Sequence, residues 1–250
     1  MQEMSEQELL KDLKHIADAL QANLPKQAAI FIPQDSLAAT LDPLRILQLR
    51  EACIHRVSEL AESTYEAFNK GNRVAGYVLA RAIYETVALF WCFVDRLEKS
   101  LETGDLEELR ETLTRMVLGS KIDKVKESIT DILKEAQEPL PKNLNPIYIS
   151  DCIKEVAKQL PPFKEHYDFL CEVTHPNAMG LIKAYVRNDF QAGISCFGKE
   201  QGSLSSHLEK DLEALILVLE SFIERYNHSG FLLIRFQKNC VSTYLSKATL

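Results

Sequence analysis

The densest polar chemistry in this sequence lies near residue 175, directly after an apolar helical stretch. Glu172 and His175 are three residues apart, so on a helix their side chains are close enough to act together. Pro176 disfavours the helical conformation of the residue before it, so we expect the helix to end at His175, near the carbonyl end of the helix dipole. Asn177 follows. This stretch is therefore the first candidate for a functional site.

A second pair of charged residues lies in a stretch that is otherwise apolar nearly all round a helix. Arg81 and Glu85 are four residues apart within the range 72–100. A lone buried charge is strongly destabilising, so each must pair with the other or with a polar group on a facing helix. These two residues are the most informative charges in the first half of the chain.

Three interpretations of these residues stay open. In the first, His175 and Asn177 cap their helix and hydrogen-bond across to Glu85 or Arg81, which locks a polar cluster inside a bundle. In the second, a ligand-binding pocket forms over the same residues, and in the third they are catalytic. The catalytic candidates are Arg81, Glu172 and His175. The candidates for a ligand-binding or polar cluster are Arg81, Glu85, Tyr167, His175 and Asn177.

Around these residues the sequence resembles prokaryotic HEPN-like helical proteins, and more closely the uncharacterised bacterial families within or near that group. The resemblance covers residues 42–230 and rests on Arg81-x-x-x-Glu85 and on a helix ending in Glu172-x-x-His175-Pro-Asn177. It implies a helical bundle, often dimeric. In active members of the group, it also implies a metal-independent ribonuclease.

In such a ribonuclease an arginine and a histidine lie close together on one helix. The arginine holds the phosphate and the histidine moves the proton of the attacking hydroxyl. This chain departs from that pattern, because no arginine occupies the preceding helical turns before His175. Arg81 or Arg187 would have to supply the guanidinium from elsewhere in the fold.

Glu172-x-x-His175 is also half of the motif that carboxylate-bridged di-metal bundles use. Glu85, with Glu62 or Glu66, could supply further ligands. A full site needs the half-motif twice and two more glutamates, and the sequence has no second Glu-x-x-His. We therefore expect no bound metal and no cofactor.

Composition limits the class of protein. The chain has 250 residues, of which 46% are hydrophobic and 26% charged, enough for a sizeable core. A net charge of -7 argues against nucleic-acid binding by the whole surface, although a local RNA-binding patch stays open. Six scattered cysteines without a C-x-x-C pair indicate reduced thiols in the cytoplasm. No signal peptide or membrane span is evident, so we expect no membrane partner.

Helical spacing of apolar residues predicts an all-α fold, a single bundle of about seven to nine helices. Two short apolar segments separated by turn-forming residues predict one small β-hairpin near 185–197. Ser5 and Glu8 form a capping box at the first helix, and residues 24–41 are expected to be a packed connector. Asp42-Pro43 is expected to start a long helix, followed by a central helix over roughly 72–100. Gly230 is expected to separate the last two helices.

These elements predict an N-terminal arm and connector over residues 1–41 and a bundle domain over 42–250. The isolated histidines are expected to be exposed; they are His55, His166, His207 and His228. The first and last helices have apolar faces that a compact bundle would leave uncovered, which predicts a homodimer.

The expected function is a non-enzymatic interaction or ligand-binding protein of the bacterial cytosol, with a protein as partner. One alternative is a HEPN-type endoribonuclease in stress or phage defence, with RNA as partner. The other is a carboxylate-bridged metal-binding bundle.

Overall fold

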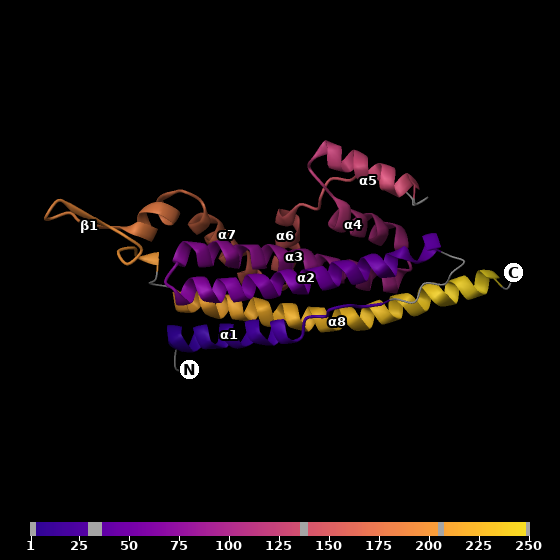
Figure 1. Cartoon of the computed structure of the whole chain (residues 1–250), viewed down its shortest axis with the longest axis horizontal. Coiled ribbons are helices and arrows are strands. Elements are labelled where there is room, and N and C mark those ends of the chain that lie inside the picture. The colour runs from indigo at the N-terminus through magenta and orange to yellow at the C-terminus, as the bar shows by residue number, and fades with distance from the viewer. Residues whose placement is uncertain (1–3, 30–36, 136–139, 205–207, 249–250) are drawn as a thin grey trace. The chain divides into compact units, whose positions relative to one another are not determined.

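The computed structural model describes residues 4–29, 37–135, 140–204 and 208–248. Its helices are α1 (Glu6–Ala22), α2 (Leu37–Asn69), α3 (Arg73–Thr103), α4 (Leu106–Leu118), α5 (Asp123–Glu135), α6 (Ile149–Gln159), α7 (Pro161–Thr174), the π-helix η1 (Ala178–Lys183) and α8 (Leu208–Ala248). Between η1 and α8 lie two antiparallel strands, β1 (Val186–Asp189) and β2 (Ile194–Phe197). The predicted all-α fold with a small hairpin is confirmed (Figure 1).

The elements cluster into two compact units. Unit 1 comprises Met1–Leu24, Ile54–Ala88 and Ile153–Phe222, and unit 2 comprises Pro25–Cys53, Leu89–Cys152 and Ile223–Leu250. Helices α2, α3 and α8 each contribute one segment to each unit. The chain therefore enters and leaves each unit more than once, and the arm over residues 1–41 and the bundle domain over 42–250 stay predictions.

Helix α1 belongs to unit 1 and begins as its sequence predicts. The Ser5 hydroxyl accepts a hydrogen bond from the backbone of Glu8, and the Glu8 carboxylate accepts one from the Ser5 N–H at 2.9 Å. The Ser58 hydroxyl of α2 donates to Gln21 at 2.9 Å. The apolar face of α1 is buried; its residues are Leu9, Leu10, Leu13, Ala17 and Leu20. The prediction that the first helix leaves an apolar face uncovered is therefore wrong.

Helix α3 contributes large, fully buried side chains to unit 1, among them Tyr77, Ile83 and Tyr84. Among the helices the structure describes, it is the one whose length and composition would let it cross a membrane. In the fold, 67% of the apolar 18-residue stretch of this helix is buried.

In unit 2, helix α2 starts earlier than expected, at Leu37, so Pro43 lies inside it. Asp42 does not act as a helix cap, because it is buried and its carboxylate binds the Arg110 guanidinium at 2.6 and 3.0 Å. Helix α2 therefore begins inside the expected connector over 24–41, and residues 30–36 of that connector lie outside the described residues.

Helix α8 continues through Gly230, where two helices were expected. Gly230 lies beside the Arg50 side chain, and a Cβ there would lie 3.4 Å from the guanidinium, an ordinary van der Waals contact. That guanidinium donates to Ser229 Oγ at 3.0 Å and lies 3.6 Å from the centre of the Tyr226 ring. The helix is therefore unbroken at Gly230, and packing contacts of Arg50 flank this position.

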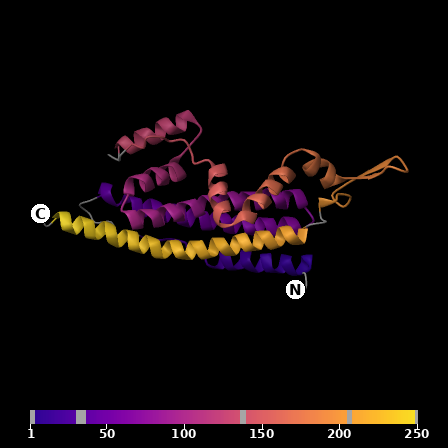
Figure 2. The same cartoon turned by 180° about the vertical axis from the view of Figure 1, so that it is seen from behind.

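The hairpin of unit 1 follows η1 directly, and Figure 2 shows it from behind. Its register pairs Val186 with Phe197 and Asp189 with Ile194. The connecting turn follows Asp189. The Oδ1 atom of this residue accepts hydrogen bonds from the N–H groups of Gln191 and Ala192, both at 3.0 Å. The hairpin extends beyond the ends of the neighbouring elements α7 and η1 in both views (Figures 1 and 2).

Candidate functional site

Arg81 and Glu85 form the ion pair that their spacing predicts. Arg81 Nε lies 3.0 Å from Glu85 Oε1, and the Tyr167 hydroxyl donates to the same oxygen at 3.1 Å. Arg81 Nη1 donates to Thr174 Oγ1, also at 3.1 Å. The two charged side chains retain 31% and 32% of their exposure, so the cluster lies at the surface of unit 1 and is not sealed inside it.

His175 and Asn177 do not join that cluster. His175 is the C-cap of α7, where its backbone N–H donates to the Cys171 carbonyl, so the predicted helix end is confirmed. Its imidazole is exposed and makes no hydrogen bond or ion pair with the residues that the structure describes. Asn177 Nδ2 instead donates to the exposed Glu172 carboxylate at 2.8 Å. The expected bonds to Arg81 or Glu85 are absent from the described part of the chain.

Asn177 caps the next element, the π-helix η1, which the sequence analysis missed. Its Oδ1 accepts from the N–H groups of Met179 and Gly180 at 2.8 and 3.0 Å. A Cβ at Gly180 would collide with the backbone carbonyl oxygens of Val173 and His175. A glycine is therefore required where the chain turns from α7 towards the hairpin.

A second polar network of unit 1 contains His166, a residue expected to be exposed. That expectation is wrong, because the side chain keeps only 14% of its exposure. Its Nδ1 lies 2.6 Å from the Tyr84 hydroxyl and its Nε2 lies 3.1 Å from Asp211 Oδ1. The Tyr77 hydroxyl donates to the other Asp211 oxygen at 2.6 Å. We call these four residues the buried network.

The chemistry of its partners assigns the proton positions in the buried network. A carboxylate only accepts hydrogen bonds, so His166 Nε2 carries the proton that Asp211 accepts. In the neutral imidazole, Nδ1 then accepts from the Tyr84 hydroxyl. Burial raises the pKa of Tyr84 and of Tyr77, and the negative charge of Asp211 raises both further. Both phenols therefore stay protonated and donate, which leaves every polar group of the network paired.

A helical pattern could have located His166. The buried residues of α7 include Phe163 and Leu170, and His166 lies three residues after the first and four before the second. It therefore falls on the buried face, where its ring stacks with Phe169 at 6.0 Å between centroids. Asp211 comes from α8, and nothing local in the sequence pairs it with His166.

Tyr167 is the neighbour of His166 on α7 but belongs to the other cluster. Its pKa is raised to about 12 by burial, by a hydrogen bond with Cys171 and by the charge of Glu85. The Arg81 guanidinium opposes that rise. The Tyr167 phenol is therefore a proton donor at neutral pH, and it holds Glu85 in place.

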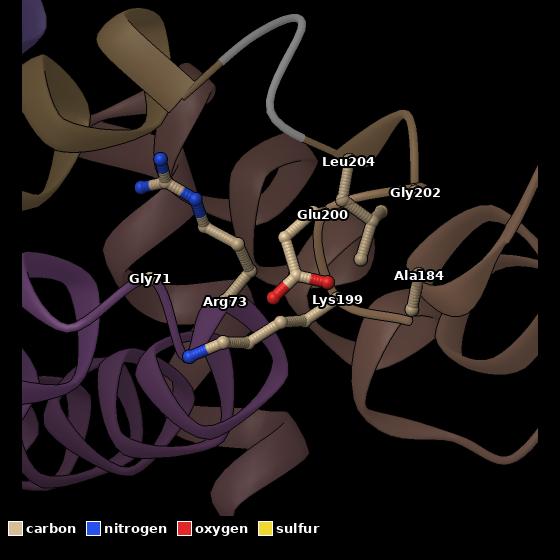
Figure 3. A pocket seen from close by; sticks show the side chains of 7 residues that line it. All are labelled: Gly71, Arg73, Ala184, Lys199, Glu200, Gly202 and Leu204. Atoms are coloured by element: carbon tan, nitrogen blue, oxygen red, sulfur yellow. The ribbon is translucent and has the colours of Figure 1, made fainter. Parts of the chain in front are cut away.

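Two adjoining clefts of about 210 and 230 Å³ lie beside the start of α3 and share Arg73, Ala184 and Lys199. In Figure 3 the Arg73 guanidinium points away from the Glu200 carboxylate. Arg73 Nη2 donates to Glu6 at 2.9 Å, and the Lys199 ammonium donates to the Lys70 carbonyl at 3.0 Å. Neither cleft is lined by a residue of the polar cluster expected from sequence.

The described residues contain no set of ligands that would support the di-metal hypothesis. There, no group of three or more histidine, cysteine, aspartate or glutamate side chains is placed to hold a metal ion. Glu172 instead pairs with Asn177, and Glu85 with Arg81.

The most exposed apolar side chains lie after α7. We call the following residues of η1 and the hairpin the hairpin surface: Leu181, Ile182, Tyr185, Phe190, Ile194 and Phe197. Phe190 is 90% exposed and Phe197 is 75% exposed, the two highest values for large apolar side chains in the described chain. Clustered exposure of this kind marks interaction sites, whereas single exposed apolar residues are ordinary.

Compared with protein-family models, with curated proteins and with solved structures, the chain matches none of them. The candidate functional site therefore rests on geometry and chemistry alone.

Proposed function

We propose that this protein is a non-enzymatic interaction module that self-associates through the hairpin surface. The exposure of six large apolar side chains within residues 181–197 carries the proposal. Removing apolar surface from water is favourable by about 25 cal/mol per Å², and aromatic residues supply much of the binding energy at protein interfaces. The proposal includes a cytoplasmic location, where free thiols such as Cys53 and Cys92 stay reduced.

The polar side chains of the buried network and of the Arg81–Glu85 pair are already hydrogen-bonded within unit 1, which supports a binding role over a catalytic one. The buried network uses both ring nitrogens of His166 and both oxygens of Asp211, so it offers no free base to a substrate. Arg81 is held by Glu85 and Thr174. These groups stabilise unit 1, whereas the six apolar side chains of the hairpin surface stay exposed in the single chain.

One contact favours a second candidate function, a metal-independent ribonuclease. Arg81 binds the side chain of Thr174, which immediately precedes His175. In that function Arg81 would hold a phosphate and His175 would move the proton of the attacking hydroxyl. Cleavage of a mixed RNA pool in the presence of chelator, by the wild type but not by His175→Ala, would establish it. An interaction module predicts cleavage by neither.

Sedimentation velocity of the full chain over a concentration series tests the proposed function. We expect a wild-type dimer at high concentration, and a shift to monomer for Phe190→Ser and for Phe197→Ser. Ile122→Ser is the matched control, because Ile122 is 63% exposed outside the hairpin surface. Far-UV circular dichroism confirms that each variant is folded.

Two results would overturn this assignment. A wild type that stays monomeric at every concentration removes self-association. Phe231 of α8 is 69% exposed and lies on the last helix, whose apolar face also predicted dimerisation. Dissociation caused by Phe231→Ser, with none caused by Phe190→Ser, would move the interface to α8.

A further inference from the structure

We propose that the second copy pairs edge to edge with β1, in an antiparallel register that places Asn188 on the two-fold axis. This inference rests on the proposed self-association and specifies its contact. In this register residue 187 lies opposite residue 189 of the second copy, and residue 186 lies opposite residue 190. The two hairpins then form one four-stranded sheet.

The outer edge of β1 has the backbone groups that this pairing needs. Gly198 N–H donates to the Tyr185 carbonyl at 2.9 Å, which continues the β1–β2 register by one step. Hydrogen-bonded pairs alternate along an antiparallel ladder, so Arg187 and Asp189 also face β2 with their backbone groups. The N–H and C=O groups of Val186 and Asn188 consequently point outward. Along the described chain, no other backbone group binds them.

The outward-facing residues make the proposed register possible. Two copies of Asn188 would form a hydrogen-bonded pair across the axis, with Cα atoms about 5.5 Å apart. Arg187 and Asp189 of the second copy would form a non-hydrogen-bonded pair, about 4.5 Å apart, where side chains are closest. A two-stranded hairpin alone is marginally stable in water, so two further strands would stabilise it.

Charge selects this register over its neighbours. Arg187 and Asp189 flank Asn188 symmetrically, so the two-fold axis brings each arginine opposite an aspartate, twice. The Asp189 Oδ1 atom holds the hairpin turn, and its other oxygen is left to receive the arginine. A shift of one residue along the strand would remove both pairs. Strand β2 has no charged residue and so has no comparable means of fixing a register.

The same register gives a reason for the exposure of the two most exposed phenylalanines, because both would be covered in the dimer. Val186 lies opposite Phe197 within the hairpin, and it would lie beside Phe190 of the second copy, the first residue of the turn that follows β1. Each end of the interface would therefore carry a row of Phe197, Val186 and the second copy's Phe190. Both phenylalanines, 90% and 75% exposed in the single chain, would gain apolar neighbours. A contact of this size is small, so the dimer should be weak and concentration-dependent.

Charge reversal tests the register by sedimentation of the full chain. Arg187→Asp and Asp189→Arg should each weaken the dimer about tenfold, because two attractive pairs become two repulsive ones. An equimolar mixture of the two variants should recover wild-type association as a heterodimer, since every pair is then opposite in charge. Asp189→Asn keeps the turn-capping oxygen and should give an intermediate loss.

Disulfide formation is a second readout that leaves the charges and the turn intact. Asn188→Cys, in a Cys196→Ser background, should link two copies under mild oxidation, because about 5.5 Å between Cα atoms suits a disulfide. Ser195→Cys in the same background is the control, since Ser195 lies opposite Asn188 on β2 and away from the axis. It should link far more slowly.

The outcomes separate this inference from the function on which it rests. Recovery in the mixture and selective linking at position 188 support the β1 register. A wild type that dimerises through Phe190 while the charge variants associate equally, with no preference for linking at position 188, overturns the register and leaves the interaction module standing. A monomeric wild type overturns both.

Discussion

The buried network and the hairpin surface lie in the same unit, but their side chains differ in how fully they are paired or covered within the single chain. The four polar side chains of the network pair completely with one another. Six large apolar side chains of the hairpin surface face water. A paired polar group has little left to offer a ligand, whereas exposed apolar surface gains from association. The comparison therefore moves the search for function from the polar residues to the apolar ones.

The largest effect is expected from breaking the buried network at Asp211. Asp211→Ala leaves the Tyr77 hydroxyl and the His166 N–H without an acceptor, so we expect a loss of about 3 kcal/mol in the free energy of unfolding. Urea denaturation followed by circular dichroism measures it. Asp131→Ala is the control, because Asp131 is 71% exposed and should change stability by less than about 0.5 kcal/mol. A loss below about 1 kcal/mol would contradict the paired network.

Two histidines of the same region sharpen the comparison. His166→Ala removes both hydrogen bonds of a buried ring and should lower the free energy of unfolding by about 2 kcal/mol. His175→Ala removes an exposed ring and should change it by less than about 0.5 kcal/mol. The same denaturation experiment compares them directly. Equal losses would show that His175 has a structural role that its exposure does not predict.

A smaller effect should appear at alkaline pH. The folded pKa of Tyr84 is raised by burial, so above about pH 10 the unfolded chain loses a proton that the folded chain keeps. The folded state then binds more protons, and stability must fall as pH rises. Tyr84→Phe should lower stability by about 1 kcal/mol at neutral pH and flatten this alkaline decline.

Denaturation midpoints between about pH 8 and pH 12 measure that slope, across the unfolded tyrosine pKa. Tyr148→Phe, at a side chain that is 59% exposed, is the control and should parallel the wild type. An alkaline decline equally steep in Tyr84→Phe would remove Tyr84 as its cause.

The smallest effect on stability is expected at the hairpin surface. Phe190→Ser at low protein concentration should leave the free energy of unfolding within about 0.5 kcal/mol of the wild-type value, because the ring is 90% exposed. The same variant should dissociate the dimer. A large loss of monomer stability would mean that Phe190 packs within its own chain, and the contrast between the two regions would disappear.

Local signals predicted the elements well. The capping box at Ser5, the end of α7 at His175 and the Arg81–Glu85 pair each depend on residues within one helical turn or so of one another. The hairpin was also predicted from local signals, two short apolar segments separated by turn-forming residues. The spacing of residues along the sequence is enough to predict contacts of this kind.

The remaining features depend on partners that are distant in sequence. Asp42 is no helix cap because it lies inside α2 and its carboxylate binds Arg110. Helix α8 passes through Gly230, where it is packed against Arg50 from a distant part of the sequence. His166 has a buried role because Asp211 and Tyr84 reach it from other helices. The exposure of Phe190 had no local signal either, since periodicity distinguishes apolar positions but not which of them stay uncovered.

The order in which the buried network is assembled has a consequence for synthesis of the chain. Its bonds span 134, 82 and 45 residues, and Asp211 is the last member to be made. Until α8 is available, Tyr77 and His166 lack the carboxylate that pairs them, while the apolar hairpin has already been synthesised. Long-range contacts of this kind form slowly, and exposed apolar strands are prone to aggregate in the meantime. A nascent or truncated chain that stops before Asp211 should therefore be far more dependent on chaperones than the complete one.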